Sequence, residues 1–265
     1  MLSSSSKDHV AGKGTSRWFM NLGATLGFTS WTIVAVFGIG SIIGGIVFYG
    51  GMAQLGIEID QKSALLQLLL SVTIYTIGMM VLLIEPYAVR RMAMQQVRTL
   101  IGLARRPILK DIGYGLIAWG AYMALTVVGT LIIKSLTPGV DLDQAQDVGF
   151  KNITDSLDIF YAFLVIVIIA PIVEEIVFRG YLYGSLRPRM PWWLAAVIVS
   201  LLFSIVHGQI NLAIDTFFLS MVICYLRDRT GAIWSGIFVH SLKNALAFYI
   251  LFLAPEWVRL LLMGL

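Results

Sequence analysis

The stretch Ala170-Pro-Ile-Val-Glu-Glu-Ile-Val-Phe-Arg-Gly-Tyr-Leu-Tyr-Gly-Ser-Leu-Arg-Pro-Arg-Met-Pro191 decides the fold, because it places charges inside an apolar segment. It follows the almost purely apolar run 159–169. Glu174 and Glu175 then stand where a lipid-facing helix carries no ionisable group. Charged side chains at that depth are costly, and by default they mark a functional site. We therefore expect a reactive site inside a membrane, with the rest of the chain forming its walls.

Helical spacing gives the two glutamates different roles. Glu175 and Arg179 are four residues apart, so they lie on one helix face and can form a charge-assisted pair. Glu174 points about 100° away and has no partner on its own helix. An unpaired, desolvated carboxylate holds a proton readily, as a general base or acid must. Pro171 lacks an N–H group, so we expect a kink just before the pair. The alternative is a structural ion pair with a spare carboxylate at a water-filled junction.

The composition indicates a membrane protein. The 265-residue chain is 58% hydrophobic and 13% charged, with a mean hydropathy of +0.85. Soluble domains carry about 25% charged residues, so we expect an all-α, polytopic membrane protein. The net charge of +4 is modest and does not point to a nucleic-acid partner. The single cysteine, Cys224, excludes an intrachain disulfide.

Seven apolar segments are candidate membrane spans. They are 29–49, 64–85, 113–135, 158–179, 192–208, 212–226 and 232–252. We expect a bundle of about seven transmembrane helices, with the site buried between the last four. We expect the chain to divide into a disordered tail at 1–17, N-terminal transmembrane helices with a basic cytoplasmic connection at 18–154, and a transmembrane core at 155–265 that carries the reactive site.

The connections between these spans alternate in charge. One set contains Arg90, Arg91, Arg98, Arg105, Arg106 and Lys110, then Arg187 and Arg189, then Arg227 and Arg229. The other contains Glu58, Asp60, Asp141, Asp143, Asp147 and Asp155. Basic loops stay in the cytoplasm, so we expect the N-terminus inside and the C-terminus outside. The short tails and the absence of retention signals favour a bacterial plasma membrane over an organelle. The connection 86–111 is interpreted as a topology anchor, with binding to anionic lipid as the alternative. Lys243, inside the last span, is expected to snorkel or to face a wet cavity.

Two histidines within the apolar spans complete the candidate site. Glu174 lies 17 residues before the proline that ends the quoted stretch, and His207 lies 16 residues after it. A rise of ~1.5 Å per residue places both about 24–26 Å of helix from that loop. His240 and Asn244 share a helix face, and on the same rise they lie about 12–18 Å deep. We expect all four side chains to converge on one cavity, and a helix break near Gly180 would improve the match.

The ordered motifs around these residues resemble the CPBP family, which comprises type II CAAX prenyl proteases and bacteriocin-processing (Abi) intramembrane proteases. The family pattern is Glu-Glu-x-x-x-Arg, then Phe-x-x-x-His, then His-x-x-x-Asn on successive helices. The chain reads Glu174-Glu175-Ile-Val-Phe-Arg179, then Phe203–His207, then His240–Asn244. The resemblance covers roughly residues 155–252, and the first three spans carry no such motif.

The resemblance implies an intramembrane glutamate endopeptidase. Glu174 would activate a water for attack on a peptide carbonyl, helped by His207. His240 and Asn244 would donate hydrogen bonds to the developing oxyanion. Glu175 and its arginine partner would hold the geometry. The implied partners are membrane lipids and a peptide or lipidated protein substrate, such as a prenylated tail or a leader peptide.

A zinc site is the competing mechanism. Two glutamates and two histidines could bind Zn²⁺ through a mixed nitrogen and oxygen set, as in a metalloendopeptidase. The sequence lacks His-Glu-x-x-His, the pattern that would make this case directly. The resemblance favours an enzyme without a metal, so we expect no cofactor and no metal ligands.

Two functions outside catalysis stay open. The first is a catalytically silent membrane protein that binds a partner in bacteriocin self-immunity or regulation. The second is a transporter that uses Glu174 as a proton relay, although the sequence shows no inverted repeat. Replacing Glu174 by Gln discriminates between the first function and a protease, because only the protease depends on that carboxylate.

Overall fold

A computed structural model describes residues 23–58, 60, 63–137, 150 and 153–254. These residues form helices joined by short connections and, over the described ranges, include no β-strand. The all-α expectation is therefore confirmed. The expected tail at 1–17 and the acidic residues Asp141, Asp143 and Asp147 lie outside the described residues.

The first half of the described chain forms four helical segments. They are Gly23–Gln54, which includes the π-helical η1 (Ile33–Gly40) and α2 (Ser41–Gln54); α3 (Ala64–Ile84), continued by η2 (Glu85–Val89); α4 (Met94–Leu100); and α5 (Leu109–Leu136). The Ser63 side chain caps α3 by accepting a hydrogen bond from the Leu66 amide at 3.4 Å. Such a cap satisfies an amide that has no partner within the helix.

One continuous helix, Ser156–Arg189, carries both glutamates. It runs through α6 (Ser156–Phe163), η3 (Leu164–Ile169), α7 (Ala170–Glu174), η4 (Glu175–Leu182), α8 (Tyr183–Leu186) and the 3₁₀ turn η5 (Arg187–Arg189). Because η3 and η4 are π-helical, their turns hold more residues than α-turns do. The irregularity expected near Pro171 thus takes the form of π-helix on both sides of α7. The helix does not break at Gly180. Instead, the wider turns of η4 shorten the segment between Glu174 and the end of the long helix, which brings Glu174 closer to the level of His240.

The C-terminal half continues with α9 (Trp192–Ile205), α10 (Ile210–Thr230), α11 (Trp234–Phe248) and η6 (Tyr249–Leu253). Within the described ranges, five helices are long and apolar enough to cross a membrane: Gly23–Gln54, Ala64–Val89, Leu109–Leu136, Ser156–Arg189 and Trp234–Leu253. Helix α9 has only 14 residues, and α10 carries Asp215, Arg227 and Asp228. The chain is a multi-pass membrane protein, and the number of seven spans stays a prediction.

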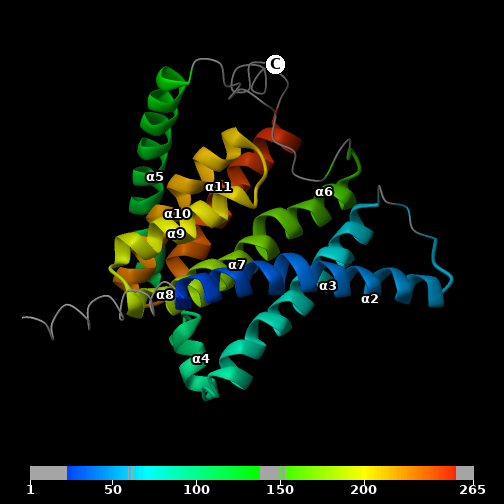
Figure 1. The fold of residues 1–265 in the computed structure, drawn as a ribbon. Coiled ribbons are helices and arrows are strands. Elements are labelled where there is room, and N and C mark those ends of the chain that lie inside the picture. The colour runs from blue at the N-terminus through cyan, green and yellow to red at the C-terminus, as the bar shows by residue number, and fades with distance from the viewer. Residues whose placement is uncertain (1–22, 59, 61–62, 138–149, 151–152, 255–265) are drawn as a thin grey trace, which may run out of the picture.

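The long helix lies between two groups of helices (Figure 1). On one side, α2 and α3 pack against each other, and α3 also contacts α6 and η3. On the other side, α5, α9, α10 and α11 form a bundle in which α10 contacts both α5 and α9. Helix α11 packs against η3 and α7. This contact brings the histidine of α11 to the glutamates of the long helix.

The basic connections gather at one end of the bundle, as the alternation of charge predicts. Arg227, near the end of α10, donates to the carbonyl of Leu100 in α4 at 3.0 Å. Arg187, at the end of the long helix, forms an ion pair with Asp228 of α10 at 2.5 Å. Three connections that are far apart in the sequence therefore share one end. By the positive-inside rule we expect this end to face the cytoplasm.

The quoted stretch is mostly buried from Glu175 to Leu186. Its side chains, among them Phe178 and Leu182, pack against Ala195 and Val199 of α9 in the largest buried cluster. Gly180 allows the chain before α5 to approach closely, because a Cβ atom there would lie 2.7 Å from the Ile101 carbonyl oxygen. The stretch that decides the fold is thus enclosed by elements from both halves of the chain.

Candidate active site

The ion pair expected between Glu175 and Arg179 forms at the centre of the molecule. Arg179 Nη1 donates to Glu175 Oε1 at 2.7 Å, and both side chains are 0% exposed. A buried charge is costly unless it is paired, so each group depends on the other. The predicted pair is confirmed.

Phe203 of α9 supports Arg179 from a second direction. Arg179 Cζ lies 4.2 Å from the centre of the Phe203 ring, which is a cation–π geometry. The same ring meets the imidazoles of His207 and His240 edge-on, at centroid distances of 4.7 and 5.7 Å. The phenylalanine of the Phe-x-x-x-His motif is therefore a shared spacer between the guanidinium and both histidines.

His240 connects the two glutamates. Its Nδ1 lies 3.0 Å from Glu175 Oε1, and its Nε2 lies 3.7 Å from Glu174 Oε2. A carboxylate only accepts, so Nδ1 carries the hydrogen of the first contact, and Nε2 faces Glu174. The His240 side chain is 3% exposed, whereas that of Glu174 is 24% exposed. Of the two adjacent carboxylates, Glu174 is the one that a small molecule can reach.

His207 follows the end of α9 and keeps one nitrogen free of the backbone. Its Nδ1 donates to the Phe203 carbonyl at 2.6 Å, so in the neutral ring Nε2 carries the lone pair. The Phe203 ring contacts both histidines, and His240 in turn contacts Glu174. These contacts link α7, the turn after α9, and α11, and the convergence of all four side chains on one cavity stays a prediction.

Like His240, Asn244 contacts the long helix, but its partner is a backbone carbonyl. Asn244 Nδ2 donates to the Ile166 carbonyl at 2.9 Å. Ile166 belongs to the π-helical η3, where the hydrogen-bond pattern differs from that of an α-helix. The shared face of His240 and Asn244 is confirmed, since both side chains turn toward the long helix. This contact uses one of the two N–H bonds of the Asn244 amide.

A second polar cluster lies beside the site and was missed from the sequence. Lys243 Nζ forms an ion pair with Asp215 Oδ2 at 3.2 Å, and the two side chains are 13% and 17% exposed. The Tyr122 hydroxyl donates to the other oxygen of Asp215. The expectation that Lys243 snorkels or faces a wet cavity is wrong, because its charge is paired within the bundle. Asp215, a lone acid in the apolar segment 212–226, was the available signal.

Gly236 is a further residue that sequence reasoning missed. A Cβ atom at this position would lie 2.9 Å from Glu175 Oε2 and 2.5 Å from Ile223 Cγ2. Gly236 lies one turn before His240 on α11, so the absence of a side chain lets the helix approach the buried carboxylate. A glycine one turn before the His-x-x-x-Asn motif was the only sequence signal for this contact.

The residues that could hold a metal are the two glutamates and His240. Within the described ranges, however, no group of three or more His, Cys, Asp or Glu side chains has an arrangement suited to a metal ion. Metal dependence is therefore a question for the enzyme assay below.

Comparison with known proteins finds a similarity over the part of the chain that carries this site. Residues 156–246 match the family model described as type II CAAX prenyl endopeptidase Rce1-like. The chain is 31% identical over 98 residues to the "Putative membrane peptidase YdiL" of Bacillus subtilis, which is 36% of this chain and 40% of the relative. It is 31% identical over 125 residues to an "Uncharacterized 24.3 kDa protein" of Escherichia coli, which is 44% of this chain and 56% of the relative.

A third relative extends the match to another bacterium. The chain is 28% identical over 137 residues to "UPF0177 protein YxdF" of Lactococcus lactis, which is 51% of this chain and 71% of the relative. The chain spans about half the length of the relatives that it matches. No solved structure matches it. The resemblance drawn from the three motifs is confirmed: residues 156–246, which contain all three, are similar to the Rce1-like, type II CAAX prenyl endopeptidases, and the named relatives are consistent with the CPBP family.

Proposed function

We propose that the chain is an intramembrane endopeptidase in which Glu174 activates a water molecule. The observation that carries this proposal is the contrast between adjacent carboxylates. Glu175 is fully buried and ion-paired. Glu174 is partly accessible, and its ion-pair contact among the described residues is His240 Nε2 at 3.7 Å. A carboxylate that is reachable, weakly paired and surrounded by apolar helices has the properties of a general base.

The proposed reaction is hydrolysis of a peptide bond. The water oxygen adds to the carbonyl carbon while Glu174 takes one water proton, and His207 Nε2 accepts a hydrogen bond that orients the water. The carbonyl oxygen becomes the oxyanion of a tetrahedral intermediate. The C–N bond then breaks, Glu174 returns the proton to the departing amine nitrogen, and a carboxylate and an amine are released.

His240 and Asn244 are proposed to stabilise the oxyanion. Each already uses one N–H bond inside the protein, to Glu175 and to the Ile166 carbonyl respectively. The proposal assigns the second amide N–H bond of Asn244 to the developing charge, a contribution of about 3–4 kcal/mol per donor in well-studied hydrolases. His240 donates from Nε2 only in the form that carries a second proton, because the neutral ring has a single N–H bond. The contacts already made fix the orientation of both side chains before substrate binds.

The proposed substrate is a membrane-associated peptide, either a lipidated tail or a leader peptide. The family model that matches this chain is described by CAAX prenyl endopeptidase activity, which supports a substrate held at the membrane. The proposed mechanism uses the Glu175–Arg179 pair as a scaffold and requires no metal ion.

Cleavage of a pooled peptide library by the purified chain in liposomes tests the proposal. Wild type is compared with Glu174→Gln and His207→Ala, each with and without a chelator. Glu58→Gln is the matched control, because Glu58 is exposed and belongs to a different part of the chain. We expect cleavage that persists in chelator, is retained in the control and is lost in both site variants.

Two results would redirect the assignment. Cleavage that stops in chelator and returns with Zn²⁺ would move the site to the metalloenzyme class. Absence of cleavage by folded wild type, with a phenotype that Glu174→Gln does not change, would favour the catalytically silent protein that binds a partner.

A further inference from the structure

A long groove opens between α5, α9 and α10, away from the glutamates. Its volume is about 790 Å³. On α5 the small side chains of Ala118 and Ala121 leave the space, and Leu125 is the last residue of this helix that lines it. Val222 of α10 forms part of the opposite wall. The body of the groove is thus apolar and lies along two helices of the membrane bundle.

The mouth of the groove is basic. Arg105, Lys110 and Arg229 line it, and its lining includes no Glu or Asp. Arg105 is neutralised by Asp111, and the hydrogen bonds that it donates to that carboxylate raise the pKa of Arg105. Lys110 and Arg229 are exposed, and neither forms an ion pair with another described residue. Two positive charges therefore face the mouth without a neutralising carboxylate.

Aromatic side chains place the mouth at the membrane interface. Tyr114, Trp192 and Tyr225 line the groove near its basic end, and the rings of Trp192 and Tyr225 are 5.6 Å apart. Tyrosine and tryptophan concentrate at the level of lipid headgroups. From Tyr114 to Leu125, α5 rises about 16 Å. That length is close to one leaflet, which is half of the ~30 Å hydrocarbon core.

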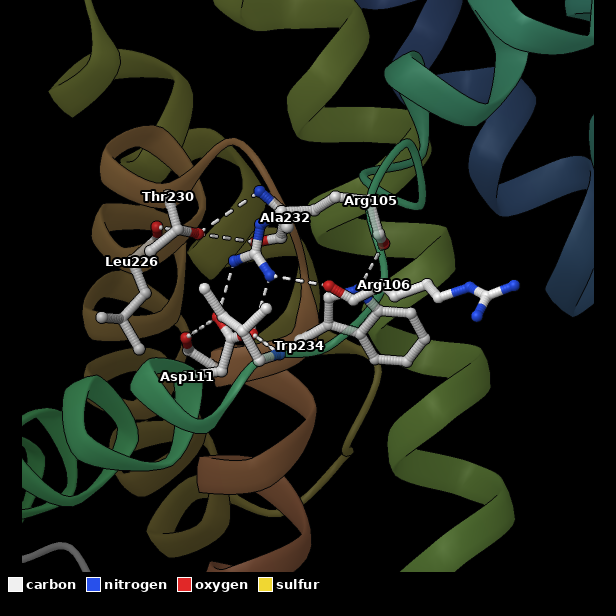
Figure 2. Close-up of polar contacts among 9 residues, drawn as sticks. Arg105, Arg106, Asp111, Leu226, Thr230, Ala232 and Trp234 are labelled. Atoms are coloured by element: carbon white, nitrogen blue, oxygen red, sulfur yellow. Dashed lines mark hydrogen bonds and ion pairs between the residues drawn. The ribbon is translucent and has the colours of Figure 1, made fainter.

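The mouth is also held rigidly. In Figure 2, Arg105 points at Asp111, and their two hydrogen bonds measure 2.7 and 2.6 Å. Trp234 Nε1 donates to the Arg105 carbonyl at 2.8 Å, and Ser235 donates to Asp111 at 3.0 Å. The side chain of Arg106 points away from this cluster (Figure 2). The start of α5 is therefore fixed against α11, and the two cations that remain lie on a preformed rim.

We propose that this groove binds one anionic phospholipid, with an acyl chain along α5 and α10 and its phosphate group between Lys110 and Arg229. The apolar length accommodates the chain, and the rim supplies cations where a headgroup lies. A basic pocket between transmembrane helices at the cytoplasmic side is the recognised setting for such headgroups. The bound lipid rests on the α5–α10 contact, which also includes the bond from Tyr122 to Asp215. The site is independent of the proposed peptidase activity.

Native mass spectrometry of the full chain in detergent tests the site. The probes are phosphatidylglycerol, phosphatidylcholine with identical acyl chains, and glycerol phosphate without chains. Two interfacial cations are worth about 1 kcal/mol each, so we expect phosphatidylglycerol to bind about 30-fold more tightly than phosphatidylcholine. Lys110→Gln with Arg229→Gln should abolish this preference, and Lys110→Arg with Arg229→Lys should retain it.

Two further variants separate charge from shape. Arg98→Gln with Arg106→Gln also removes two exposed arginines from the basic end, but neither residue lines the groove. It should keep the lipid preference. Ala121→Phe fills the groove and should weaken binding of both phospholipids at least tenfold. The proposal would be overturned if wild type bound the two phospholipids with equal affinity. It would also be overturned if Arg98→Gln with Arg106→Gln lost the preference for phosphatidylglycerol as completely as Lys110→Gln with Arg229→Gln. If glycerol phosphate bound as tightly as phosphatidylglycerol, the rim would be a site for free phosphate, and the lipid proposal would be overturned as well.

Discussion

Replacing Glu175 by Gln tests whether the buried ion pair holds the site together. The two side chains have nearly the same volume, so the change removes a charge and preserves packing. Arg179 then keeps its charge at 0% exposure, with the Phe203 ring 4.2 Å away as the remaining strong contact among those described. A desolvated cation–π contact contributes about 2 kcal/mol, whereas breaking a buried pair costs about 3–5 kcal/mol. We therefore expect the free energy of unfolding to fall by about 3–5 kcal/mol.

Unfolding in mixed detergent and SDS micelles, followed by far-UV circular dichroism, measures this loss. Glu174→Gln is the matched control, because Glu174 is 24% exposed and only weakly paired, and it should cost less than about 1 kcal/mol. Glu175→Gln combined with Arg179→Met removes the unpaired charge and should recover more than half of the loss. If Glu175→Gln were no less stable than Glu174→Gln, the reasoning from the buried pair would be refuted.

Three other substitutions test residues around the pair. Gly236→Ala places a Cβ 2.9 Å from Glu175 Oε2 and should cost about 1–3 kcal/mol in the same unfolding assay; stability equal to wild type would show that α11 moves freely. Asp215→Asn leaves Lys243 without its counter-ion and should cost about 2 kcal/mol, most of it regained on adding Lys243→Met; a cost that the second change does not reduce would contradict the pairing. Asn244→Ala removes the bond to the Ile166 carbonyl and should cost about 1 kcal/mol, with a fall in kcat larger than that in stability; unchanged kcat would remove Asn244 from the proposed oxyanion site.

The sequence predicted the parts of the site that depend on short spacing within one helix. Glu175 and Arg179 are four residues apart, as are His240 and Asn244, and such pairs share a face even where the helix contains π-turns. The burial of these polar residues followed from the apolar segments that surround them. Counting residues from the basic connections brought Glu174 level with His207 but placed His240 closer to those connections.

Contacts between distant segments could not be derived in this way. The pairing of Lys243 with Asp215 depends on how α11 is rotated against α10, which spacing within either helix does not specify. The π-helical segments around α7 were also unforeseen, since no local residue pattern distinguishes them from an α-helix with a proline. They correct the depth estimate, which assumed a uniform rise per residue, and they leave the Ile166 carbonyl as an acceptor for Asn244.

Single-turnover cleavage of one peptide found in the library screen tests the role of Glu174 most directly. The rates of wild type, Glu174→Gln and the Glu58→Gln control would be measured in liposomes with chelator present, alongside the unfolding assay. A general base contributes about 10²–10⁴-fold to the rate, so Glu174→Gln should lose that factor while remaining folded, and the control should match wild type. A Glu174→Gln protein that cleaves within tenfold of the wild-type rate would contradict the assignment of Glu174 as the group that activates water.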